Sequence, residues 1–351
     1  MIGLPRAEEA VRAHLGARFT AAVLRVERNG ASAERAIGEL QPGGAPAEVG
    51  SLFDYASLTK LFVATAALRL AARGTLALDA PVAPWIPQWR HAPCGATLRM
   101  LLAHTAGLRS GVDVRTLRDG DVCRYALESD LAADPGERVV YSDLGFILLG
   151  KIIERASGDA LERVVRREVL EPLGASADVG YLPPRSLRSR IAVTEYCTWR
   201  ERLIHGEVHD EKCFAMGGVA GHAGIFGDAR TVAALGRAYL EAERETLLPA
   251  ALAREAVSEQ AWDPILRRGL GWALRTGEEN SCGRYWSPDT FGHTGFTGTC
   301  IWVDAERDLV VVLLSNSVYV DRSDTRAFRQ AVFEGALLDT EWLAAGARPG
   351  P

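Results

Sequence analysis

The sequence predicts an α+β fold, with an antiparallel sheet flanked by helices and joined to a mostly helical domain. Stretches with the composition of strands lie near both ends of the chain, whereas the middle has the apolar spacing of helices. Short turns separate neighbouring strands, as in antiparallel pairs. One sheet assembled from both termini, with the helical middle as an insertion, accounts for this order.

The N-terminal part begins the sheet. A short helix is expected over residues 8–15, and residues 20–28 (TAAVLRVER) and 33–40 are predicted strands. Asn29 and Gly30 between the two strands form a dipeptide typical of a two-residue hairpin. We therefore expect the first two strands to pair with each other.

Helices are predicted for the middle of the chain. Gly74 and Gly158 follow two of them and are typical of helix C-termini. The helix before Gly158 has apolar residues at helical spacing, at Leu144, Ile147 and Leu148. The predicted helices cover residues 57–73, 97–103, 144–156, 160–170 and 230–244.

The C-terminal part returns to strands, which are followed by a closing helix. A hairpin-like turn separates the last two strands. These strands and the closing helix are predicted at residues 269–275, 299–304, 309–315 and 324–337. The order of elements predicts a discontinuous sheet domain, residues 1–60 and 215–351, and a mostly helical domain, residues 61–214.

Composition and charge exclude some classes of partner. The chain has 351 residues, of which 48% are apolar, and a net charge of −5 without a basic block, so nucleic acid is not an expected partner. No stretch approaches the roughly 18 to 20 apolar residues that span a bilayer, and no membrane association is expected. The N-terminus carries Glu8, Glu9 and Arg12 where a signal peptide is apolar, so the simplest location is cytoplasmic. The six cysteines are scattered and are expected to be reduced.

Ser57 and Lys60 form an S-x-x-K tetrapeptide at the head of an apolar helical run. Residues three apart on a helix lie on the same face, so the serine can be a nucleophile and the lysine can take its proton. The tetrapeptide alone is weak, because two fixed positions match often by chance. Two tripeptides strengthen it, Y-S-D at residues 141–143 and H-T-G at residues 293–295.

The three motifs together resemble the serine β-lactamase and penicillin-binding-protein superfamily. The pattern is most similar to the class C β-lactamase-like serine hydrolases and esterases, which carry S-x-x-K, then Y-x-N, then K-T-G or H-T-G. Three longer segments, LLAHTAGL, PGERVVYSDLGFILLGKIIERASG and GHTGFTGTCIWVDAERDLVVVLLSN, extend the resemblance over most of residues 20–337. The resemblance implies the fold predicted above, with an active site in the cleft between the two domains.

The resemblance also implies a role for each motif. Ser57 is the nucleophile, and Lys60 and Tyr141 form a general-base pair that titrates as a unit. Burial and nearby positive charge are expected to lower the pKa of Lys60, so that it accepts a proton near neutral pH. For Tyr141, a core position at a helix entry is the alternative. No cofactor and no metal are implied.

The H-T-G motif is implied to form the substrate side of the cleft. The backbone N–H groups of Ser57 and Phe296 are the implied oxyanion hole, and Thr294 lies next to it. Gly295 suits a place where substrate approaches strand backbone closely. For His293, a structural place at the end of a strand is the alternative.

Two departures from the β-lactamase pattern bear on the substrate. Asp143 stands where Y-x-N has asparagine, and an ionised carboxylate only accepts hydrogen bonds. His293 stands where K-T-G has lysine, and histidine is mostly neutral at pH 7. Both make efficient β-lactamase or carboxypeptidase activity less expected and favour esterases and aminopeptidases. Asp143 either contacts substrate or simply caps the helix that follows.

A glycine-rich segment, residues 206–227, is a further candidate site. It resembles a segment found in a subset of the family, and His209, Asp210 and His222 are predicted to line the mouth of the cleft. A metal site built from these three is not favoured. His104 is expected to be structural. Five tryptophans in predicted loops are either core or walls of an acyl pocket: Trp85, Trp89, Trp199, Trp262 and Trp286.

These observations predict a serine hydrolase of the esterase or amidase type that acts through an acyl-enzyme on Ser57. The expected partner is a small ester or amide substrate. The alternatives are an acyltransferase of the same fold in a biosynthetic pathway, and β-lactamase or D-aminopeptidase activity. A non-catalytic binding module is disfavoured because Ser57, Lys60 and Tyr141 occur together. The sequence determines neither the acyl and leaving groups nor the oligomeric state.

Overall fold

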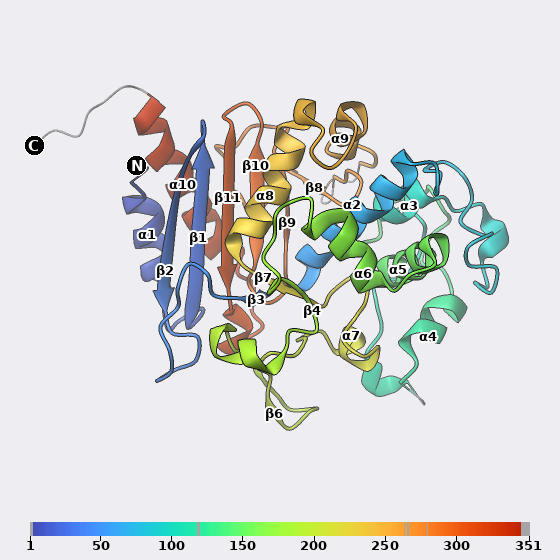
Figure 1. The fold of residues 1–351 in the computed structure, drawn as a ribbon, viewed down its shortest axis with the longest axis horizontal. Helices are drawn as coiled ribbons and strands as arrows, with labels where there is room; N and C mark the ends of the chain where they lie inside the picture. The colour runs from blue at the N-terminus through green and yellow to red at the C-terminus, as the bar shows by residue number, and fades with distance from the viewer. Residues whose placement is uncertain (1–2, 118–119, 263, 265–266, 279, 345–351) are drawn as a thin grey trace, which may run out of the picture.

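A six-stranded antiparallel sheet forms one side of the molecule, and most of the helices lie on the other side (Figure 1). The structure is a computed structural model that describes residues 3–344, apart from 118–119, 263, 265–266 and 279. The strand order is β2-β1-β11-β10-β9-β8, so the N-terminal hairpin pairs with strands from the end of the chain. The predicted α+β fold, with one sheet built from both termini, is confirmed.

The strands of the large sheet are β1 (Ala21–Arg28), β2 (Ala31–Gly38), β8 (Ala273–Leu274), β9 (Phe291–Thr294), β10 (Cys300–Asp304) and β11 (Leu309–Ser315). A small sheet contains β3 (Phe53–Asp54), β7 (Ile225–Gly227) and β4 (Gly180–Tyr181), and β5 (Tyr196–Cys197) pairs with β6 (Arg202–Leu203). The α-helices are α1 (Pro5–Arg12), α2 (Thr59–Ala72), α3 (Leu98–Leu102), α4 (Val122–Glu128), α5 (Asp143–Ser157), α6 (Leu161–Val165), α7 (Glu211–Ala215), α8 (Ala229–Leu240), α9 (Ala250–Ala256) and α10 (Arg326–Ala344).

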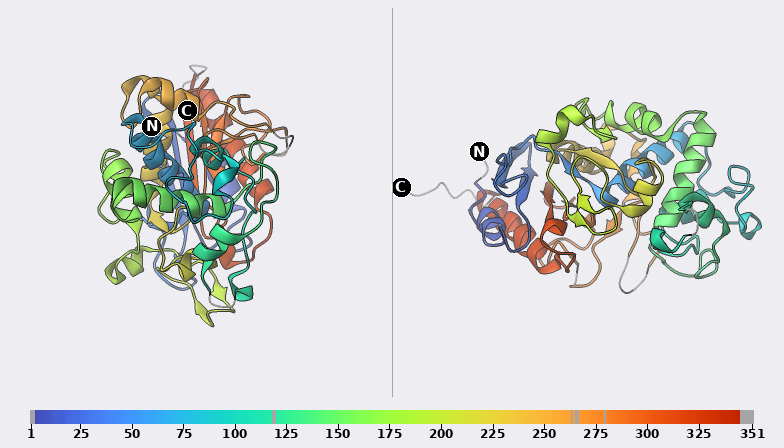
Figure 2. Two further views of the ribbon diagram at one scale, coloured as in Figure 1. Left: turned by 90° about the vertical axis from the view of Figure 1, so that its right-hand side faces the viewer. Right: turned by 90° about the horizontal axis from the view of Figure 1, so that it is seen from below.

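Strand β11 has an uninterrupted apolar sequence because helices cover both faces of the sheet. Val310 and Val312 belong to the core shared with α8, whereas Val311 and Leu313 belong to the core shared with α1 and α10. Helix α8 packs against β1, β10 and β11, and α1 packs along α10 on the opposite face (Figure 2). A strand buried on both sides loses the alternation of apolar and polar residues that a half-exposed strand shows.

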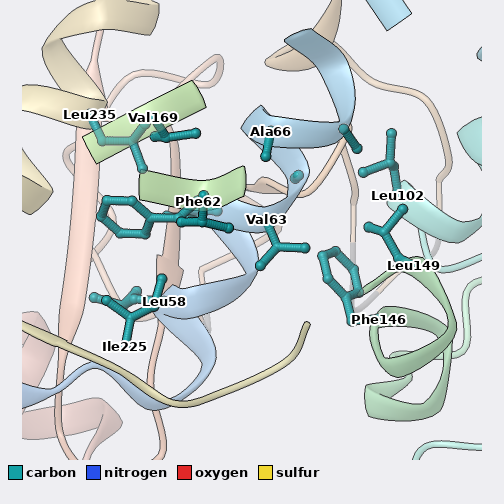
Figure 3. Packing of buried hydrophobic residues seen from close by; sticks show 14 of the residues in the cluster. Leu58, Phe62, Val63, Ala66, Leu102, Phe146, Leu149, Val169, Ile225 and Leu235 are labelled. Carbon is teal, nitrogen blue, oxygen red and sulfur yellow. The ribbon is translucent and has the colours of Figure 1, made fainter. Parts of the chain in front are cut away.

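Helix α2 is the centre of the second core. Its Phe62, Val63 and Ala66 lie among side chains from other elements, including Phe146 of α5 and Ile225 of β7 (Figure 3). A helix that is apolar on every side is a buried helix. The first turn of α2 therefore offers a rigid base for a functional site.

Every predicted helix and strand has a counterpart, but several bounds are shifted, as for α1 (Pro5–Arg12, predicted at residues 8–15), and one strand and one helix differ for a clear local reason. Of residues 269–275 only β8 is a strand, because Gly271 adopts a left-handed φ of +84° that interrupts the ladder. The helix predicted for residues 57–73 begins with a 3₁₀ turn, Ala56–Leu58, before α2. All six cysteines are free, as predicted. Among the described residues, we find no helix with the length and apolar character needed to cross a bilayer.

Candidate active site

Ser57 lies in the 3₁₀ turn that leads from β3 into α2. The preceding residue, Ala56, has a φ of +48°, which residues other than glycine rarely adopt. The buried Asp54 carboxylate holds this turn, because its Oδ1 accepts a hydrogen bond from the Ala56 N–H at 2.9 Å and its Oδ2 accepts one from the His209 N–H at 2.7 Å. The strain next to the serine is thus stabilised by the surrounding structure.

Lys60 is the closest polar neighbour of the serine. Its side chain is fully buried, and Nζ donates hydrogen bonds to Ser57 Oγ at 2.8 Å and to the carbonyl of His222 at 3.3 Å. Nζ also lies 2.8 Å from Asp143 Oδ1 and 4.8 Å from the centre of the Tyr141 ring. The structure therefore brings together the residues of the first two motifs.

The expected pKa of Lys60 is wrong in direction. Burial lowers the pKa of Lys60, but the Asp143 carboxylate and then Tyr141 outweigh burial, so its pKa lies above the ordinary value. Burial raises the pKa of Asp143, but Lys60, His222 and Lys212 lower it further, so that the net pKa is below the ordinary value. Lys60 is therefore an ammonium and Asp143 a carboxylate at neutral pH.

The capping alternative for Asp143 is also wrong. The N-cap of α5 is Ser142, whose Oγ accepts a hydrogen bond from the Gly145 N–H at 3.0 Å. The Asp143 side chain instead bonds Lys60 and lies 3.3 Å from the ammonium of Lys212. Its carboxylate is therefore part of a charge network beneath the serine.

The charge network continues into the glycine-rich segment. Lys212 lies 2.9 Å from Asp210 Oδ2, and His222 Nε2 lies 2.8 Å from Asp210 Oδ1. Asp143, Asp210 and His222 each offer a metal-ligand atom, and these atoms lie within 4.8 Å of one another. The ammonium groups of Lys60 and Lys212 already bond both carboxylates, so a metal ion would have to displace them. We therefore assign no metal to this cluster.

Tyr141 lies on one wall of the cleft, between two histidines. Its ring centre is 4.6 Å from that of His104 and 6.0 Å from that of His293. His104 Nδ1 accepts a hydrogen bond from the Ser142 N–H at 3.0 Å, so this histidine holds the segment that carries Tyr141. Tyr141 is only half-buried and faces the cleft, unlike a core tyrosine.

His293 is buried at the end of β9. Its Nδ1 lies 2.9 Å from the carbonyl of Thr294, which can only accept, so Nδ1 carries the hydrogen. Burial, and after it the charges of Arg268 and Lys60, hold the pKa of His293 well below its usual range. His293 is therefore neutral at pH 7, and no residue that the structure describes bonds its buried Nε2.

The H-T-G turn is tied to the serine turn by close backbone packing. Thr299 Oγ1 donates a hydrogen bond to the carbonyl of Tyr55 at 2.9 Å. A Cβ on Gly295 would lie 2.5 Å from that same carbonyl and 2.0 Å from Thr299 Oγ1. The approach of the serine turn thus already requires glycine at this position, and the close approach of substrate to Gly295 stays a prediction. The N–H groups of Ser57 and Phe296 have no acceptor among the residues described.

A cleft of about 1010 Å³ lies above these groups and is at the upper end of the range for small-molecule sites. The predicted residues that line it are Ser57, Tyr141, His293, Thr294, Gly295 and Phe296. His209, Asp210 and His222 do not line it: Asp210 and His222 belong to the charge network, and His209 Nε2 lies 3.2 Å from Glu195 Oε1. None of the five loop tryptophans lines it either, whereas Trp302 of β10 does.

Arg268 is a cleft residue that the sequence did not reveal. Its side chain is only 5% exposed, and its guanidinium carbon lies 5.0 Å from the centre of the Tyr141 ring. Nε and Nη1 of Arg268 are buried and have no hydrogen-bond partner within the described part of the chain. Because the run around Arg268 matches no motif, only the folded chain shows it beside Tyr141.

Replacing Asp143 by asparagine will move the alkaline limit of activity to lower pH. Asp143 holds the proton on Lys60, so its loss lowers the pKa of Lys60, and the ammonium that bonds Ser57 is lost earlier as pH rises. The pH profile of kcat/KM measures this change. The control is Asp210→Asn, which removes a carboxylate that is not bonded to Lys60 and should move the limit less. An unmoved limit in Asp143→Asn would contradict the assignment.

Comparison with known proteins places the chain in a family. The family model described as Beta-lactamase matches residues 7–335. A protein of Escherichia coli (strain K12) named "Putative D-alanyl-D-alanine carboxypeptidase" is 30% identical over 316 residues, which cover 79% of this chain and 72% of that protein. The "N-acetylmuramyl-L-alanine amidase" of Bacillus subtilis (strain 168) is 29% identical over 383 residues, covering 96% and 86%.

Solved structures share the fold at lower sequence identity. A class C β-lactamase from Rhodobacter sphaeroides superposes with a TM-score of 0.77 at 21% identity, covering 96% of this chain and 99% of that chain. The structure described as "EstCE1, a hydrolase with promiscuous acyltransferase activity" has a TM-score of 0.76 at 22% identity, covering 94% and 98%. At such identities the likeness concerns the fold alone.

Proposed function

The chain belongs to the Beta-lactamase family, and we propose that it is a serine hydrolase that cleaves a small amide or ester through an acyl-enzyme on Ser57. The observation that carries this proposal is the hydrogen bond of 2.8 Å from the buried Lys60 Nζ to Ser57 Oγ. A lysine with a raised pKa next to a serine stabilises the developing alkoxide.

In the proposed first step, Ser57 Oγ attacks the carbonyl carbon and loses its proton. Lys60 is already an ammonium and cannot take a second proton, so the step starts from the form of the Lys60–Tyr141 pair in which Tyr141 has given up its own proton, and the phenolate oxygen then accepts the serine proton. The carbonyl oxygen becomes an oxyanion between the free N–H groups of Ser57 and Phe296. Tyr141 then returns the proton to the leaving group as the carbon–leaving-group bond breaks. In the second step, water attacks the acyl carbon in place of Ser57. Tyr141 accepts a proton from the water and returns it to Ser57 Oγ as the bond between Oγ and the acyl group breaks.

We propose that the substrate carries a carboxylate that binds Arg268. The neutral His293 supplies no permanent charge, but the guanidinium of Arg268 lies next to it in the cleft wall. Arg268 lines the cleft, no described carboxylate forms an ion pair with it, and its Nε and Nη1 have no hydrogen-bond partner among the described residues, so a substrate carboxylate would supply the missing opposite charge. The names of the Escherichia coli and Bacillus subtilis relatives, a carboxypeptidase and an amidase of amino-acid-containing molecules, support an amide with a nearby carboxylate.

Replacing Arg268 by leucine will weaken binding of anionic substrates selectively. We expect KM for an N-acyl-D-amino acid to rise about 10- to 100-fold, since a hydrogen bond to a charged group contributes roughly 1.5–3 kcal/mol. The same amide with its carboxylate converted to a carboxamide should show a much smaller change. Steady-state kinetics with this matched pair of substrates measures the difference.

The matched control is Arg267→Leu. Arg267 lines the same cleft, but Glu259 already pairs with it at 2.7 Å. Equal losses for the acid and the carboxamide in Arg268→Leu would reject the carboxylate site and leave the acyl-enzyme proposal standing. Product analysis with an added amine acceptor separates hydrolysis from acyl transfer, and transfer as the main product would overturn the hydrolase proposal.

A further inference from the structure

Arg329 of α10 lines the cleft and reaches the turn that follows β9. Its Nη2 donates a hydrogen bond to the carbonyl of Gly295 at 2.8 Å and lies 3.5 Å from that of Thr299. Nε of Arg329 is buried without a partner, and no carboxylate among the described residues forms an ion pair with this arginine. Burying a guanidinium without a paired carboxylate costs folding free energy, so this arginine calls for a functional explanation.

The bonded carbonyl belongs to the peptide that provides the second oxyanion donor. The carbonyl of Gly295 and the N–H of Phe296 are parts of one peptide unit, and the described chain contains no cis peptide bond. In a trans peptide the C=O and N–H point in opposite directions. When Arg329 holds the carbonyl on one side, the Phe296 N–H is directed to the other side.

The opposite side of this peptide adjoins the nucleophile. Gly295 packs directly on the backbone of Tyr55 and on Ala56, the residues just before Ser57. The cleft is lined by Ser57, Gly295 and Phe296, among other residues. The Phe296 N–H has no acceptor in the described chain. The Phe296 N–H is therefore a free hydrogen-bond donor that can bind an oxygen of a ligand in the cleft.

We propose that Arg329 is a positioning residue for the oxyanion hole, because it fixes and polarises the peptide whose N–H receives the oxyanion. The inference rests on the proposed acyl-enzyme mechanism. Hydrogen bonds in a chain strengthen one another, so a charged donor on the carbonyl makes the N–H of the same peptide a better donor. Its effect is largest when negative charge develops on the substrate oxygen.

The turn has a second support, which allows Arg329 to be removed without unfolding it. The N–H of Gly298 also bonds the Gly295 carbonyl, at 3.1 Å, and Thr297 Oγ1 bonds the carbonyl of Asp54 at 2.8 Å. Without Arg329 the Gly295 carbonyl therefore keeps a neutral partner. A variant at this position loses the charge and keeps the local hydrogen-bond pattern.

The test uses Arg329→Met and Arg329→Lys in the full-length chain. We expect kcat in Arg329→Met to fall about 10- to 100-fold with KM little changed, less than the roughly 10²- to 10³-fold cost of deleting an oxyanion donor. Infrared spectra of the acyl-enzyme should show the ester carbonyl stretch at higher wavenumber, because a weaker oxyanion hole polarises it less. Arg329→Lys, which restores a cation, should recover part of both changes.

The control is Arg69→Met, which removes an arginine that also bonds a backbone carbonyl, that of Leu247, but that does not line the cleft. It should lower the melting temperature without moving the carbonyl stretch. An Arg329→Met enzyme with an unchanged stretch and unchanged kcat would overturn the inference. Failure of the wild-type protein to form an acyl-enzyme would instead overturn the proposed function, so the two outcomes are distinguishable.

Discussion

Replacing Ser57 by alanine will reduce kcat/KM for ester and amide substrates by on the order of 10⁴- to 10⁶-fold. The hydroxyl is the only side-chain group of this residue, and it is the acceptor of the Lys60 hydrogen bond, whereas the backbone N–H of the oxyanion hole stays in the variant. Asp54 holds the turn before Ser57, and core packing holds α2 after it, so the variant should fold normally. Initial rates with p-nitrophenyl esters and amino-acid p-nitroanilides measure the loss.

The control for this variant is Ser51→Ala. Ser51 is buried, and its hydroxyl accepts a hydrogen bond from the Glu48 N–H outside the cleft. Its removal should leave kcat/KM close to that of the wild type. Activity in Ser57→Ala within tenfold of the wild type would show that another group performs the reaction.

Replacing Lys60 by methionine will cost about 10²- to 10³-fold in kcat/KM, the usual range for removing a donor that stabilises a developing negative charge. Methionine fills the buried space but donates no hydrogen bond to Ser57 Oγ. Asp143 keeps its second ammonium, Lys212, so no carboxylate is left unpaired. We therefore expect the loss in the rate of acylation and only a small change in melting temperature.

The matched control for Lys60→Met is Lys212→Met, which replaces the second lysine of the charge network. It removes an ammonium from the same carboxylate but leaves the bond between Lys60 and Ser57 in place. The rate of acylation by an activated ester, followed in the stopped flow, should fall much more in Lys60→Met than in Lys212→Met. Equal effects would mean that the network acts only on stability.

Local sequence patterns predicted those elements whose conformation depends on residues adjacent in the chain. The hairpin at Asn29 and Gly30 forms as expected, since both residues adopt positive φ there. The strand expected over residues 269–275 shortened to Ala273–Leu274, because the backbone at Gly271 turns where Ala64 packs against it. That neighbour is about two hundred residues away in sequence, and no local pattern contains it.

The candidate site shows the same division between local motif and tertiary packing. S-x-x-K, Y-S-D and H-T-G were recognisable because each is contiguous. Arg268 and Arg329 were not, because each lies outside the motifs and reaches the site only through the packing of distant segments. The pKa of Lys60 was predicted in the wrong direction for this reason, since its sign depends on the Asp143 carboxylate that folding places 2.8 Å away.

The most direct measurement is the mass of the intact protein after reaction with a p-nitrophenyl phosphonate, followed by peptide mapping. The account predicts one added phosphonyl group on Ser57 in the wild-type protein, slower labelling in Lys60→Met and none in Ser57→Ala. Labelling at another residue, or an unlabelled but folded wild-type protein, would contradict the claim that Ser57 is the nucleophile of an acyl-enzyme.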